Sequence, residues 1–117
     1  MSRYYIGETE NLIVRFYSHN TGNGAEGTED AEFRPYCIAA YISGLSHMTR
    51  SERMELEQRW KDLVLYSVHH GVHTVWAKIE AGRQVVEDHN RKQKDPQFYI
   101  SLVETISYSG KGNKRIV

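Results

Sequence analysis

The chain has 117 residues, 39% of them hydrophobic and 11% aromatic, which fits one folded domain with a modest core and excludes a disordered protein. Fifteen lysines and arginines balance fifteen aspartates and glutamates, so the zero net charge disfavours nucleic-acid binding by bulk electrostatics and leaves only local basic patches. The single cysteine, Cys37, excludes an intrachain disulfide framework and a thiolate zinc site. No apolar run approaches the ~18 residues that span a membrane, so we expect a soluble, cytoplasmic protein.

The first half of the chain alternates short apolar runs with turn-forming residues. We expect, in chain order, a strand at residues 3–7, a helix at about 12–19, a loop at 20–32 and a strand at 36–42. Thr9 or Asn11 can cap the helix, and Gly44 ends the second strand.

The second half predicts two longer helices and a last strand. These are a helix from about residue 50 to 69 capped by Thr49 or Ser51, a helix over about 72–92, a strand over 98–106, and a basic tail over 110–117 that is mobile at its end. Gly71 separates the helices, and Asp95-Pro96 ends the second one. The expected fold is therefore α/β, one domain over residues 1–117, with a small antiparallel or mixed three-stranded sheet and about three helices.

Three side chains near the N-terminus could act together on a phosphodiester. Tyr5 closes the first strand in Tyr5-Ile6-Gly7, and Arg15 and His19 share one helix face because they are four residues apart. Arg15 can hold a phosphate in bidentate fashion, and His19 can act as a general acid or base. Tyr5 could hydrogen-bond the attacking water or, once deprotonated, serve as the base. The alternative is a surface arginine, a helix-end histidine and a packed tyrosine.

Glu57 is the best candidate for a metal ligand. At about 100° per residue, it falls among the apolar positions of its helix, whereas Glu55 falls on the outer side. A carboxylate there is costly unless it is paired or binds a metal, and Mg²⁺ or Mn²⁺ needs only one or two protein oxygens. The alternative is a salt bridge to Lys61 or Arg53 at the helix flank.

Together these residues resemble the GIY-YIG endonuclease superfamily. The segments similar to family motifs are Tyr5-Ile6-Gly7, the helix with Arg15 that leads to His19-Asn20-Thr21-Gly22, Arg34-Pro35-Tyr36, and Leu56-Glu57-Gln58-Arg59-Trp60-Lys61. The resemblance covers about residues 3–62, with matching order and spacing.

The resemblance implies metal-dependent hydrolysis of a DNA phosphodiester. Glu57 would bind a single Mg²⁺ or Mn²⁺, and Arg15 would stabilise the transition state. Tyr5 and His19 would position or deprotonate the attacking water. Phosphate contacts are expected from four basic residues, with solvated surface charges as the alternative reading: Arg15, Arg34, Lys61 and Lys111.

The chain departs from the family at its N-terminus. The family's first signature, a Gly-Ile-Tyr strand that pairs with the second, has no counterpart before Tyr5. Residues 97–104 and the glycine-rich residues 109–112 read like this strand and its turn at the other end of the chain. We therefore expect a circular permutation in which Tyr99 replaces the missing tyrosine, a truncation, or a homodimer whose second subunit covers the strand edge.

Two other function classes stay open at this point. One is a non-catalytic nucleic-acid-binding or protein-interaction module with the same fold, which the zero net charge and the acidic loop at residues 26–32 favour. The other is an unrelated small α/β domain whose spacing matches by chance. Metal binding through Glu57 would distinguish a nuclease from a bare interaction module.

Overall fold

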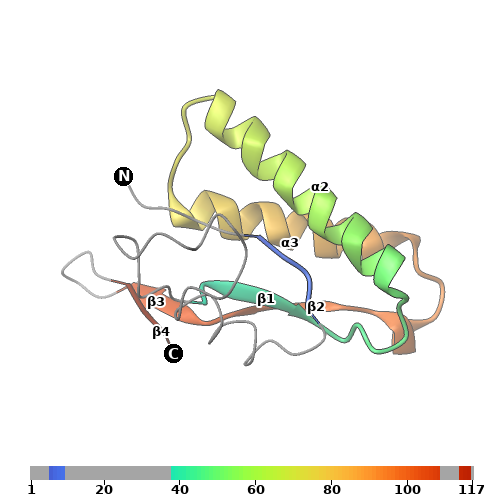
Figure 1. Ribbon diagram of the computed structural model, residues 1–117. Coiled ribbons are helices and arrows are strands. Elements are labelled where there is room, and N and C mark those ends of the chain that lie inside the picture. The colour runs from blue at the N-terminus through green and yellow to red at the C-terminus, as the bar shows by residue number, and fades with distance from the viewer. Residues whose placement is uncertain (1–5, 10–37, 109–113, 117) are drawn as a thin grey trace. The chain divides into compact units, whose positions relative to one another are not determined.

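The computed structural model describes residues 6–9, 38–108 and 114–116 (Figure 1). The chain divides into two compact units, residues 1–38 and 39–117. Ile6 and Gly7 are not in a strand. The rest of the strand predicted at residues 3–7, the predicted helix at 12–19 and the predicted loop at 20–32 lie outside the described residues. The elements below all belong to the second unit.

Helix α2 (Arg50–His69) is capped by side-chain hydrogen bonds at its start. The Thr49 hydroxyl accepts a hydrogen bond from the backbone N–H of Glu52 at 3.2 Å, and the Glu52 carboxylate accepts one from the backbone N–H of Thr49 at 3.0 Å. This reciprocal pair is a capping box, which satisfies two backbone donors that a helix start leaves free. Beyond the helix, Gly71 has φ +79°, a conformation that costs glycine little. The predicted boundaries of this helix are confirmed.

Helix α3 (Val75–Lys92) starts three residues later than the sequence pattern predicts. The Thr74 hydroxyl accepts a hydrogen bond from the backbone N–H of Ala77 at 3.1 Å, so the cap lies here and the preceding residues form the connection from α2. The predicted break after α3 is confirmed, because Asp95 caps a short 3₁₀-helix, η3 (Pro96–Phe98). Among the described helices, none combines the length and the apolar content needed to cross a bilayer.

The described residues form two antiparallel strand pairs. β1 (Ala40–Ser43) pairs with β2 (Ser101–Glu104), and β3 (Ile106–Tyr108) pairs with β4 (Lys114–Ile116). The expected single strand at residues 98–106 is therefore wrong in detail, because η3 takes its start and Thr105 separates β2 from β3. Lys114–Ile116 forms β4 within the basic tail expected over residues 110–117, and the mobility expected at the end of that tail stays a prediction. Within the described residues the sheets have two strands each, and the predicted three-stranded sheet is not seen there.

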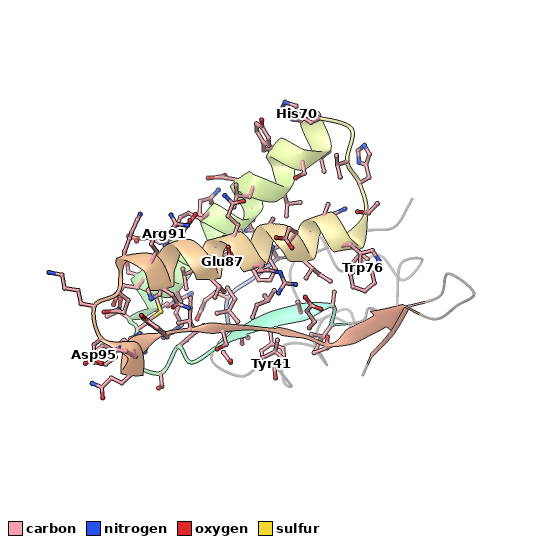
Figure 2. The ribbon with its side chains drawn as sticks, turned by 180° about the vertical axis from the view of Figure 1, so that it is seen from behind. Tyr41, His70, Trp76, Glu87, Arg91 and Asp95 are labelled. Carbon is pink, nitrogen blue, oxygen red and sulfur yellow. The ribbon has the colours of Figure 1, made fainter. Side chains whose placement is uncertain are left out.

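The core of this unit lies between α3 and the β1–β2 pair, with α2 packed on α3 (Figure 1). Ile42 and Leu102 are cross-strand partners that pack against the core, whereas Tyr41, the preceding residue on β1, extends from the opposite side of the strand (Figure 2). The buried residues of the cluster are Met48, Leu56, Val85, Val86 and Ile100. Fully burying one such aliphatic side chain is worth about 1.5–3 kcal/mol, so this small set holds the helices to the sheet.

Candidate active site

Glu57 is a half-buried carboxylate in the middle of α2. Its side chain is 18% exposed, and its sequence neighbour Leu56 is buried in the core. Glu55, two residues earlier, is exposed. The helix therefore turns Glu57 toward the protein and Glu55 toward solvent, as their spacing along the helix predicts.

Lys61 forms an ion pair with Glu57 one helical turn away. The Lys61 Nζ lies 3.1 Å from the Glu57 Oε1, and the lysine side chain is 45% exposed. This is one of the two salt bridges that the sequence left open as an alternative to a metal. The other candidate, Arg53, donates from Nη1 to the backbone carbonyl of Met48 at 2.9 Å. An i,i+4 pair in this orientation is worth only about 0.3–0.5 kcal/mol, so it can open at little cost.

The Glu57 carboxylate could hold a hard divalent cation. Mg²⁺ and Mn²⁺ keep several of their waters and need one or two carboxylate oxygens, which a single partly accessible glutamate can supply. In residues 6–9, 38–108 and 114–116, no three His, Cys, Asp or Glu side chains gather in a way that could hold a metal ion. A single carboxylate together with water could hold Mg²⁺ or Mn²⁺ there.

Tyr99 follows η3 and is not part of a strand. Its side chain is 46% exposed, and its backbone N–H donates to the carbonyl of Pro96 at 3.1 Å. The sequence predicted a strand here, but the Asp95 carboxylate accepts a hydrogen bond from the backbone N–H of Gln97 and starts a turn. The extended chain begins only at β2, which pairs with β1. The pairing expected with residues 3–7 lies outside the described residues.

The structure thus places three of the predicted site residues. It brings Glu57 and Lys61 into contact, and it puts Tyr99 in the turn before β2. The other predicted site residues lie outside the described part of the chain: Tyr5, Arg15, His19, Arg34 and Lys111.

A polar cluster that the sequence did not predict lies around His89, near the end of α3. The His89 Nε2 is buried and has no hydrogen-bond partner. Burial lowers the pKa of His89, and the nearby charges of Arg59 and His47 lower it further. The Glu52 carboxylate and a hydrogen bond to the backbone of Phe98 act on this pKa in the opposite direction. The lowered pKa favours the neutral form of His89.

The same cluster joins parts of the chain that are far apart in sequence. The rings of His47 and Phe98 stack with their centroids 5.0 Å apart and their planes tilted by 42°. Hydrogen bonds from Thr49 lower the pKa of Glu52. No short-range spacing links these residues to His89, so the pattern of the sequence carries no signal for the cluster.

Comparison with known proteins identifies the family. The family model of the GIY-YIG catalytic domain matches residues 1–66, which is more than half of the chain. The matched segment includes β1 and most of α2, with Glu57 and Lys61. No curated protein and no solved structure matches the chain. The resemblance seen in the sequence is thereby confirmed, and the chain belongs to the GIY-YIG family, whose catalytic domains are of the nuclease type.

Proposed function

We propose that the protein is a metal-dependent endonuclease that hydrolyses phosphodiester bonds of DNA. The observation that carries the proposal is the position of Glu57. It lies inside the segment that matches the catalytic domain, and it is a half-buried carboxylate whose present partner is an exposed lysine. Such a carboxylate can exchange a weak ion pair for a divalent cation.

In the proposed reaction, each of a few side chains has a separate role. Arg15 holds the non-bridging phosphate oxygens and stabilises the charge that develops on them. Tyr5 and His19 orient the attacking water and take its proton as the new phosphorus–oxygen bond forms and the bond to the leaving oxygen breaks. Mg²⁺ or Mn²⁺ at Glu57 would supply charge neutralisation at the phosphate and the leaving oxygen.

DNA binding in this proposal depends on local charge. The chain has no net charge, so phosphate contacts must come from a few positively charged side chains. We assign these contacts to Arg15, Arg34, Lys61 and Lys111. Tyr99 is the proposed substitute for the tyrosine of the family's first signature, and the residue is 46% exposed.

The second candidate is a non-catalytic module that keeps the GIY-YIG fold. The ion pair between Glu57 and Lys61 favours it, because Lys61 already partners the half-buried carboxylate without a metal. Divalent-cation binding separates the two candidates, since only the nuclease requires Glu57 to accept one.

The experiment that tests the proposal is cleavage of a mixed panel of duplex, nicked and branched DNA in Mg²⁺ or Mn²⁺ and in EDTA. Wild type is compared with Arg15→Ala and with Arg91→Ala, which removes an exposed arginine paired with Asp88 on α3. We expect metal-dependent cleavage by wild type and Arg91→Ala and loss of at least about 100-fold in Arg15→Ala. A folded wild type that cleaves none of the substrates would contradict the nuclease and favour the non-catalytic module.

A further inference from the structure

We infer that Lys61 is a positioning residue that occupies the cation position at Glu57 and exchanges with the divalent metal when DNA binds. This inference rests on the proposed function, because it assumes that Glu57 is the metal ligand. It adds a second role for Lys61, which couples metal binding to DNA binding.

The Glu57 carboxylate would have to serve two cations, Lys61 and the metal. The Lys61 Nζ lies 3.1 Å from Oε1 of Glu57, within the distance of a charge-assisted contact. A divalent cation at the same carboxylate would meet the ammonium charge at close range. The two cations therefore compete for Glu57, and Lys61 weakens metal binding as long as it stays in place.

Only the lysine side chain has to move for this exchange. Trp60 lies next to Lys61 in sequence, and its Nε1 donates to the backbone carbonyl of Lys78 at 2.9 Å. This bond fixes the turn of α2 that carries Glu57 and Lys61 against α3. The ammonium is on a flexible side chain that is 45% exposed, so it can leave Glu57 while the helix stays in place.

A DNA phosphate offers Lys61 a new partner. Lys61 lies one helical turn from Glu57, so a phosphate bound to a metal at Glu57 would come within reach of its ammonium group, which binds phosphate as a point charge. Transfer of Lys61 from Glu57 to the phosphate frees the carboxylate for the cation. DNA then strengthens metal binding, and by thermodynamic reciprocity the metal strengthens DNA binding to the same degree.

The test measures Mn²⁺ binding to the full chain without DNA, by titration calorimetry and by the electron paramagnetic resonance signal of free Mn²⁺. The variants are Lys61→Met, Lys61→Gln and Glu57→Gln. Lys92→Met is the matched control because it removes the same charge from the last turn of α3. Circular dichroism of each variant checks that the helices are intact.

We expect Lys61→Met and Lys61→Gln to bind Mn²⁺ about two- to fivefold more tightly than wild type, since they remove a weak competing ion pair and a nearby positive charge. Lys92→Met should match wild type, and Glu57→Gln should lose the site. Tighter binding by Lys92→Met as well would overturn the inference, because the effect would then be one of total charge.

Two further outcomes separate the inference from the proposed function. Unchanged or weaker Mn²⁺ binding in both Lys61 variants, with binding lost in Glu57→Gln, would overturn the role of Lys61 and leave the nuclease proposal in place. Mn²⁺ binding that survives in Glu57→Gln would remove the metal ligand from the proposed function and the inference with it.

Discussion

Trp60 of α2 lies against the bare backbone of Gly82 in α3. A Cβ atom at Gly82 would lie 2.4 Å from Cζ2 of the indole, closer than atoms in a packed interior can approach. The hydrogen bond from Trp60 Nε1 to the carbonyl of Lys78 holds the same ring one turn earlier on α3. Together the two contacts fix the indole against α3 in the part of α2 that carries Glu57 and Lys61.

The first prediction concerns this contact. We expect Gly82→Ala to lower the free energy of unfolding by about 1–3 kcal/mol through overpacking, although alanine is the better helix former by about 1 kcal/mol. Urea denaturation of wild type and variant measures the difference. In a Trp60→Leu background the clash is relieved, and Gly82→Ala should then stabilise the protein. A stabilising Gly82→Ala in the wild-type background would show that the indole has room to move.

The second prediction concerns the link between α3 and the start of β2. The Asn90 side chain donates to the carbonyl of Ile100 and accepts from its backbone N–H, both at 2.9 Å, and Ile100 is 2% exposed. Asn90→Ala leaves both backbone groups without this partner, so we expect a loss of about 2 kcal/mol in the free energy of unfolding.

Amide hydrogen exchange reports on the same link locally. The Ile100 amide should exchange faster in Asn90→Ala, while Gln84→Ala, at an exposed position of α3, should change stability by less than about 0.5 kcal/mol. Equal protection of the Ile100 amide in wild type and Asn90→Ala would mean that the side chain does not hold β2 in place.

The third prediction is a pH dependence of stability that comes from His89. Burial lowers its pKa below the ordinary value of 6.5, so the unfolded chain binds a proton at His89 more readily than the native chain. The contribution of His89 to the free energy of unfolding is fully present above pH 6.5. It is lost as the pH falls through the lowered native pKa. Thermal unfolding from neutral pH down to about pH 5 should show a falling Tm.

His89→Gln should flatten this pH dependence, because the ionising group is gone. His73→Gln is the matched control, since His73 is exposed in the connection between α2 and α3, and it should keep the wild-type slope. A wild-type slope in His89→Gln would assign the pH dependence to other groups.

Local rules of sequence predict the helices of the described unit well. Thr49 with Glu52 and the glycine at position 71 define α2 through chemistry within a few residues. The start of α3 was placed too early because Val72 fits the helical pattern, and only the Thr74 hydroxyl bond shows where the helix begins. Helix ends are thus predictable to within a turn when a capping residue is near.

The contacts that position the candidate site were not predictable in the same way. The bonds from Asn90 to Ile100 and from Trp60 to Lys78 join a side chain to a backbone group of another segment, which no periodicity reports. The sequence found Glu57 because helical spacing separates it from Glu55. It could not choose between a metal and Lys61 as the partner of Glu57, since both satisfy a half-buried carboxylate.

The most direct test of the proposed function is DNA cleavage in Mg²⁺ by Glu57→Gln beside Glu55→Gln. Both variants remove one negative charge from neighbouring positions of α2, but only Glu57 is half-buried beside Lys61, and Glu55 is exposed. We predict that Glu57→Gln loses cleavage by at least about 100-fold while Glu55→Gln cleaves like wild type. Equal cleavage by the two variants would contradict the assignment of Glu57 as the metal ligand of a GIY-YIG nuclease.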